Sequence, residues 1–104
     1  MPGVDFNVVR QRISMAEVLR LLGYRATRVR GESLRGPCPI HGSGGRPSRS
    51  FSVNVGLGRY QCFRCGSRGN ALELWAAVRG ISVYDAAIEL CEAFRIEVPW
   101  IRRW

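Results

Sequence analysis

The sequence predicts an α+β fold in which a small antiparallel sheet lies between helices at both ends of the chain. Three observations lead to this prediction. Apolar residues recur at helical spacing over residues 6–22 and again over residues 70–95. Between these regions, polar and apolar residues alternate as they do in half-buried strands. Two pairs of potential metal ligands, with two residues between the members of each pair, lie in the alternating region.

The first helical region is predicted to consist of two short helices. Ser14 and Glu17 have the spacing of a capping box, which places a helix start at residue 14. Asp5 is a suitable cap for a helix that precedes this point, and Gly23 is a suitable stop for the helix that follows it. The apolar stripe of the second helix is formed by Val18, Leu19 and Leu22.

The alternating region predicts strands at residues 28–30, 50–55 and 59–62. The last two strands are separated by Gly56-Leu57-Gly58, so residues 51–62 are expected to form a hairpin. Glycines that mark turns in this region are Gly31, Gly36, Gly56 and Gly58. Residues 42–50 are rich in Gly, Ser, Arg and Pro, which is the composition of a loop.

The second helical region is also predicted to contain two helices. Asn70 is a suitable cap for the first, and Gly80 is its expected stop. Ser82 and Asp85 have the spacing that starts the next helix. One face of that helix is apolar and includes Cys91, which is therefore expected to be a core thiol rather than a metal ligand.

The two ligand pairs predict one structural zinc ion per chain. Cys38-Pro39-Ile40-His41 and Cys62-Phe63-Arg64-Cys65 each offer two ligands separated by two residues, and a glycine follows each pair. Zinc takes four tetrahedral ligands from thiolate sulfur and imidazole nitrogen, so Cys38, His41, Cys62 and Cys65 fill its coordination sphere. A filled sphere favours a structural site over a catalytic or redox one. The predicted fold is thus a zinc ribbon flanked by helices.

The charge of the chain is concentrated near the predicted zinc site. The net charge is +8, and residues 25–68 contain nine arginines against one acid, Glu32. Such a basic region attracts polyanions, so nucleic acid is the expected partner, with a membrane surface as the weaker alternative. Every basic residue is Arg, which we ascribe to G+C-rich codon usage.

The predicted nucleic-acid contacts combine arginines with aromatic rings: Arg35, Arg46, Arg49, Arg59, Tyr60, Phe63, Arg64 and Arg68. Burial in the core is the alternative for Tyr60 and Phe63, and is expected for Phe51.

The sequence resembles the zinc-binding domain at the amino terminus of bacterial and phage DNA primases over residues 6–94. The resemblance rests on the ligand pairs, on Pro47-Ser48 before the strand at Phe51-Ser52-Val53, and on Gly69-Asn70-Ala71. It implies a ribbon packed on helices that engages single-stranded DNA template in replication, alongside a separately encoded primase or helicase component. This family usually has a charged turn where this chain has Gly42-Ser43-Gly44-Gly45-Arg46. The contacts that the turn makes in the family are therefore not expected to carry over to this segment.

The sequence does not predict an enzyme. Catalytic magnesium needs clustered carboxylates, whereas the only aspartates, Asp5 and Asp85, are far apart and the glutamates are expected on solvated helix faces. The rival interpretation is a zinc-stabilised protein-interaction module anchored by Trp75, Trp100 or Trp104. The tail at residues 98–104 could then dock on a partner, stack on bases or fray. We expect one cytoplasmic domain over residues 1–104, without a membrane partner or a small-molecule substrate.

Overall fold

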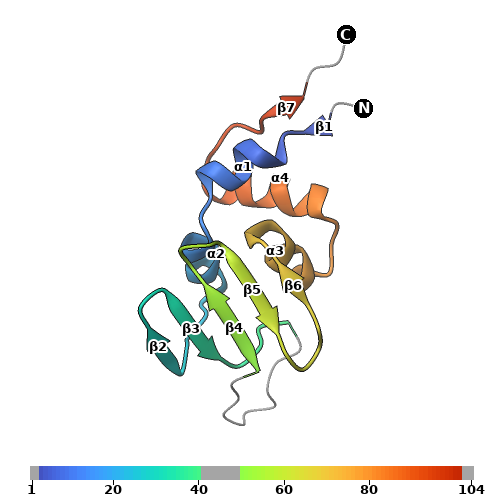
Figure 1. Ribbon diagram of the computed structural model, residues 1–104. Helices are drawn as coiled ribbons and strands as arrows, with labels where there is room; N and C mark the ends of the chain where they lie inside the picture. Colours follow the sequence, from blue (N-terminus) through green and yellow to red (C-terminus); the bar gives the residue numbers. More distant parts are fainter. Residues whose placement is uncertain (1–2, 41–49, 102–104) are drawn as a thin grey trace.

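The computed structural model describes residues 3–40 and 50–101 and confirms the α+β fold. A five-stranded antiparallel sheet has its strands in the order β2-β3-β4-β5-β6 (Figure 1). A separate pair, β1 with β7, joins the two ends of the described chain. The strands are β1 (Gly3–Val4), β2 (Arg28–Arg30), β3 (Ser33–Gly36), β4 (Phe51–Asn54), β5 (Arg59–Cys62), β6 (Arg68–Gly69) and β7 (Trp100–Ile101). The helices are α1 (Phe6–Arg12), α2 (Met15–Leu22), α3 (Ala71–Arg79) and α4 (Val83–Ala93).

The predicted caps of the first two helices are confirmed. The Asp5 side chain accepts hydrogen bonds from the backbone N–H groups of the first turn of α1. Ser14 and Glu17 form a complete capping box at the start of α2, each accepting from the backbone N–H of the other. Gly23 ends α2 with φ of 70°, a conformation that favours glycine. Local hydrogen bonding therefore divides this region at residue 14, as the sequence predicts.

The boundaries of α3 and α4 are set in the same way. Asn70 and Glu73 form a complete capping box on α3, and Gly80 ends that helix with φ of 69°. The Ser82 hydroxyl accepts from the N–H of Asp85 at the start of α4. Cys91 is fully buried on the core face of α4, which confirms it as a core thiol.

Strand register gives the five-stranded sheet one buried face and one exposed face. Leu34, Val53 and Tyr60 are paired across β3, β4 and β5, so their side chains point to the same side. A neighbouring row contains Gly36, Phe51 and Cys62. Helices α2 and α3 lie behind the sheet (Figure 1), and Phe51 and Val53 join one core with side chains such as Val18, Leu72 and Leu90.

Several features of the fold differ from the sequence prediction, which did not include strands β1, β3, β6 and β7. Gly36 ends strand β3 rather than marking a turn, because its backbone pairs with Phe51 and its bare Cα allows Tyr24 to approach. A Cβ added at Gly36 would lie 2.7 Å from the Tyr24 hydroxyl oxygen. The tail does not fray at Trp100–Ile101, which pairs with Gly3–Val4. No helix within the described ranges is long and apolar enough to cross a membrane.

Candidate metal centre and nucleic-acid interface

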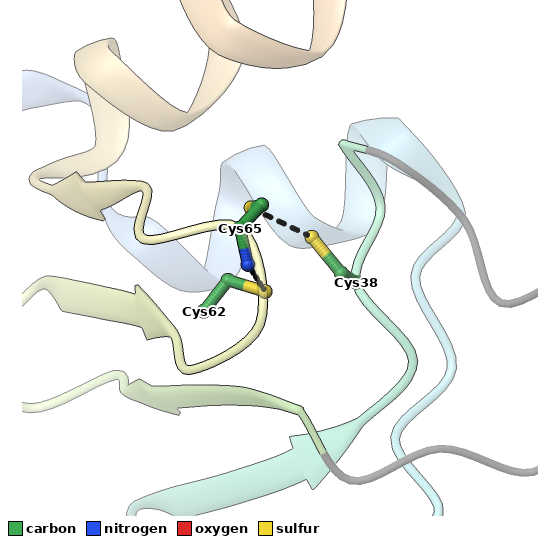
Figure 2. A group of neighbouring side chains, drawn as sticks. All are labelled: Cys38, Cys62 and Cys65. Carbon is green, nitrogen blue, oxygen red and sulfur yellow. Dashed lines mark hydrogen bonds between the residues drawn. The ribbon is translucent and has the colours of Figure 1, made fainter.

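Three of the four predicted zinc ligands lie together at one end of the sheet. Cys62 ends β5, Cys65 follows in the turn to β6, and Cys38 lies just beyond β3 (Figure 2). The turn is tight, since the N–H of Gly66 donates to the carbonyl of Cys62 over 3.0 Å and the N–H of Cys62 donates to the carbonyl of Ser67 over 2.8 Å. Gly66 has φ of 78°, which explains the glycine after this ligand pair.

The three sulfur atoms have a spacing that suits a zinc ion. They all lie within 4.8 Å of one another, and the Cys38 and Cys65 sulfurs are 4.0 Å apart (Figure 2). Zinc–sulfur bonds of about 2.3 Å in tetrahedral geometry place sulfurs about 3.8 Å apart. Cys38 and Cys62 are buried and Cys65 is exposed. The donor set and its spacing therefore fit the structural zinc predicted from the sequence.

The environment of Cys62 favours the thiolate that a metal requires. Burial raises the pKa of this thiol, but hydrogen bonds from the backbone N–H groups of Cys65 and Arg64 and from the neighbouring thiols outweigh burial and lower the pKa to about 7. The N–H of Cys65 lies 3.4 Å from the Cys62 sulfur. Burial raises the pKa of Cys91, which lies outside the cluster. The two kinds of cysteine thus differ in chemistry as well as in position.

The fourth predicted ligand, His41, lies outside the described residues, and so do Arg46 and Arg49 of the predicted nucleic-acid contacts. Cys38 lies three residues before His41, in the segment that leads to it from β3. Zinc in a structural site takes four ligands, so the three sulfurs leave one position to fill. His41 remains the predicted occupant of that position.

The exposed face of the sheet has two rows of polar side chains. Residues that are paired across neighbouring strands point to the same side of the sheet. One such row includes a residue from each of the five strands, and the other includes a residue from each of four strands. The first row is Arg28, Arg35, Ser52, Gln61 and Arg68. The second row is Arg30, Ser33, Asn54 and Arg59. We call this surface the arginine face. It contains five arginines and no acidic residue.

The arginine face includes residues that sequence reasoning missed. Arg28 and Arg30 flank Val29 in the predicted first strand, and Gln61 alternates with Tyr60 in β5. The alternation was visible in the sequence, but the register that aligns these side chains with Arg35 and Arg68 was not. Each arginine of the face has an exposed side chain.

The two predicted stacking residues have different positions. Phe63 is 61% exposed, and the guanidinium carbon of Arg35 lies 5.3 Å from the centroid of its ring, in a cation–π arrangement. Tyr60 is only 4% exposed, its ring stacks on Phe51, and its hydroxyl lies 2.8 Å from that of Ser67. The inclusion of Tyr60 among the nucleic-acid contacts is corrected, because strand alternation points its ring into the core. Arg64 is exposed in the turn between the ligands.

Few acidic groups oppose these arginines. In the part of the chain that the structure describes, the one ion pair is Arg79–Glu89 at 3.2 Å, on the helices rather than on the arginine face. Hydrogen bonds from Arg79 and Trp75 lower the pKa of Glu89. Glu32 lies in the turn between β2 and β3, next to Ser33 of the face, and Glu73 lines a cavity with Arg59 and Arg68 at the β5–β6 edge. The exposed face of the sheet therefore has an excess of positively charged side chains.

This chain is similar in sequence to known zinc-finger domains and DNA primases. A family model described as the CHC2 zinc finger matches residues 2–103. The DNA primase of Synechocystis sp. is 32% identical over 90 residues, which are 86% of this chain and 13% of that protein. The DNA primase of Lactococcus lactis is 33% identical over 93 residues, 88% of this chain and 14% of that protein. The chain therefore corresponds to about one seventh of the length of these relatives.

A solved structure has the same fold. It is a crystal structure of the Aquifex aeolicus primase that contains zinc-binding and RNA polymerase domains. The superposition has a TM-score of 0.73 at 27% sequence identity and covers 92% of this chain and 23% of that one. The similarity extends over helices and sheet alike, so the resemblance inferred from the ligand pairs is a resemblance of the whole fold.

Proposed function

This chain belongs to the CHC2 zinc finger family of DNA primases, and from that premise we propose that it engages single-stranded DNA template during replication. The chain is a primase-type zinc-binding domain. We assign one structural zinc ion to it, held by Cys38, His41, Cys62 and Cys65. In this assignment residues 1–104 form one domain, and the zinc fixes the end of the sheet from which the template surface extends.

The arginine face is the observation on which the proposal rests. Proteins that bind single strands combine positive charge along the backbone path with an aromatic platform for the bases. Here the arginines of two registered rows supply the charge, and the exposed ring of Phe63 supplies the platform. Ser52 and Gln61 lie in register between Arg35 and Arg68 and offer hydrogen bonds to bases or sugars.

Removal of arginines from this face should weaken binding in a salt-dependent way. If about three or four phosphates are neutralised, log affinity should fall with log salt at a slope of about −2 to −3, at roughly 0.7 per phosphate. Arg59→Ala and Arg68→Ala should each reduce the magnitude of that slope by somewhat less than one. Arg20→Ala on α2 removes the same charge from an exposed helix position and should leave the slope unchanged. Fluorescence anisotropy with a labelled oligonucleotide at several salt concentrations measures all four proteins.

The salt titration also tests the rival interpretation. A protein-interaction module is favoured by Trp100 and Ile101, which are 44% and 39% exposed on β7. Trp75 is a weaker anchor, because it is half-buried and its indole N–H donates to Glu89 over 2.9 Å. Absence of detectable single-strand binding at low salt, or identical slopes for wild type and the face variants, would favour that module.

We further propose that the 104-residue chain does not synthesise primers by itself. Two-metal chemistry needs carboxylates that converge on one point. Within the described residues, Asp5 caps α1 and Asp85 lies in the first turn of α4. Polymerisation would then depend on catalytic residues outside these 104, such as those of a separately encoded primase or helicase component. Purified protein should incorporate no nucleotides on a template in the presence of magnesium. Incorporation that is lost on mutation of a residue of this chain would refute the proposal.

A further inference from the structure

A groove outside the arginine face lies between α1 and the tip of the β4–β5 hairpin. Its volume is about 720 Å³. Asn7, Arg10 and Gln11 of α1 form one wall, and residues 55–59 of the hairpin form another. Figure 1 shows the hairpin tip beside the connection between α1 and α2, at the opposite end of β4 and β5 from the zinc site. The groove is thus far from the metal centre along the strands.

This groove is adjacent to the cavity at the β5–β6 edge of the arginine face. Arg59 and Glu73 line both cavities, so the two are neighbours with a shared wall. The cavity at the β5–β6 edge is also lined by Ser52, Gln61 and Arg68. Arg68, Arg59 and Arg10 therefore mark a path along two neighbouring cavities.

The charges along this path suit a polyanion. Arg10 and Arg59 are both exposed and line the groove with Glu73, while the Glu32 carboxylate lies against Gly56 of the hairpin. The Glu73 carboxylate accepts the N–H of Asn70 over 3.1 Å and lies against Gly69, where an added Cβ would be 2.6 Å from its Cδ. It is thereby held at the start of α3. Arg10 donates a hydrogen bond to the Asn7 side-chain oxygen, so both side chains are oriented on the same wall.

We propose that a single strand of nucleic acid bound on the arginine face continues past Arg59 into this groove, where Arg10 contacts a phosphate and Asn7 and Gln11 contact the adjacent nucleotide. This inference rests on the proposed function, because it extends the same strand beyond the sheet. Leu57, which is 75% exposed at the hairpin tip, provides an apolar surface for a base at the rim of the groove.

The test compares oligonucleotides of different lengths. Single-strand binding sites occupy about 4 to 16 nucleotides, so a series over that range should include strands too short to reach the groove. For the shortest strands that wild type can bind, Arg10→Ala should have the same affinity as wild type. For longer strands, the affinity of Arg10→Ala should be several-fold weaker, and the magnitude of its salt slope should be smaller by about 0.7. Arg12→Ala is the matched control, since Arg12 lies on α1 but lines a different cavity with Val98 and Trp100. It should resemble wild type at every length.

A second pair of variants tests the junction between the two cavities. Glu73→Gln keeps an N3 residue able to complete the capping box and removes the negative charge shared by both cavities, so it should strengthen binding of the longer strands. Glu17→Gln makes the same change in the capping box of α2 and should not strengthen it. Equal effects of Arg10→Ala and Arg12→Ala at all lengths, with wild-type binding intact, would overturn this inference alone. Loss of single-strand binding by wild type itself would overturn the proposed function.

Discussion

Removal of zinc is expected to unfold residues 34–68. Binding at a structural zinc site provides on the order of 10 to 16 kcal/mol, which is comparable to the whole of the roughly 5 to 15 kcal/mol that stabilises a typical domain. Strands β3 and β5 end beside Cys38 and Cys62, so loss of the metal releases the ends of both strands together. Protein purified without chelator should contain one zinc per chain, and chelation should abolish the dispersed amide signals of the ribbon in NMR spectra.

Two cysteine variants separate the metal from simple packing. Cys62→Ser should lose zinc and native ribbon signals. Cys91→Ala should retain one zinc and lose about 1 to 3 kcal/mol of stability, because it removes a fully buried thiol from α4 without touching the ligand cluster. Native ribbon signals in Cys62→Ser with chelator present would contradict a structural role for the metal.

X-ray absorption at the zinc edge tests the complete ligand set. The proposed set predicts three sulfur neighbours at about 2.3 Å and one nitrogen neighbour at about 2.0 to 2.1 Å. His41→Ala should remove the nitrogen contribution and leave the sulfur contribution. A spectrum of wild type with four sulfurs would instead implicate Cys91 and would require the buried helix α4 to move.

Local sequence signals predicted the helices and the metal cluster well. Caps such as Asp5, Ser14 and Asn70 determine helix starts through hydrogen bonds within three residues, and such bonds can be inferred from spacing alone. The ligand pairs are equally local, because a two-residue spacing with a following glycine determines the turn. Cys38, Cys62 and Cys65 therefore lie together as the spacing indicates.

The pairing of strands that are far apart in the sequence could not be predicted from local sequence patterns. The pairing of Gly3–Val4 with Trp100–Ile101 joins the two ends of the chain and has no local pattern. The arginine face likewise depends on which residue of one strand is opposite which residue of the next. A shift of one residue would move a row of side chains to the other face. Register also decides the position of Tyr60, for which the sequence left both nucleic-acid contact and core burial open and which is buried in the structure.

Phe51 and Phe63 differ in exposure, and their removal is expected to have different effects. Phe51 is fully buried, with ring centroids of Tyr24 and Tyr60 at 5.3 and 5.6 Å, and it pairs in register with the ligand Cys62. Phe51→Ala should lower the free energy of unfolding by about 3 to 5 kcal/mol, because it deletes a core aromatic and leaves a cavity. Urea denaturation of the zinc-loaded protein measures this loss.

Phe63→Ala should leave stability almost unchanged and weaken single-strand binding. Its ring is mostly exposed and contacts the Arg35 guanidinium, so its removal should change the free energy of unfolding by no more than about 0.5 kcal/mol. It should nevertheless weaken single-strand binding by about 1 to 3 kcal/mol, with little change in the salt slope, because a stacking platform is lost and no phosphate contact is. Phe51→Leu, which retains most of the core volume, should stay folded and bind normally. If Phe63→Ala bound single strands like wild type, the bases would have to stack on a residue other than Phe63.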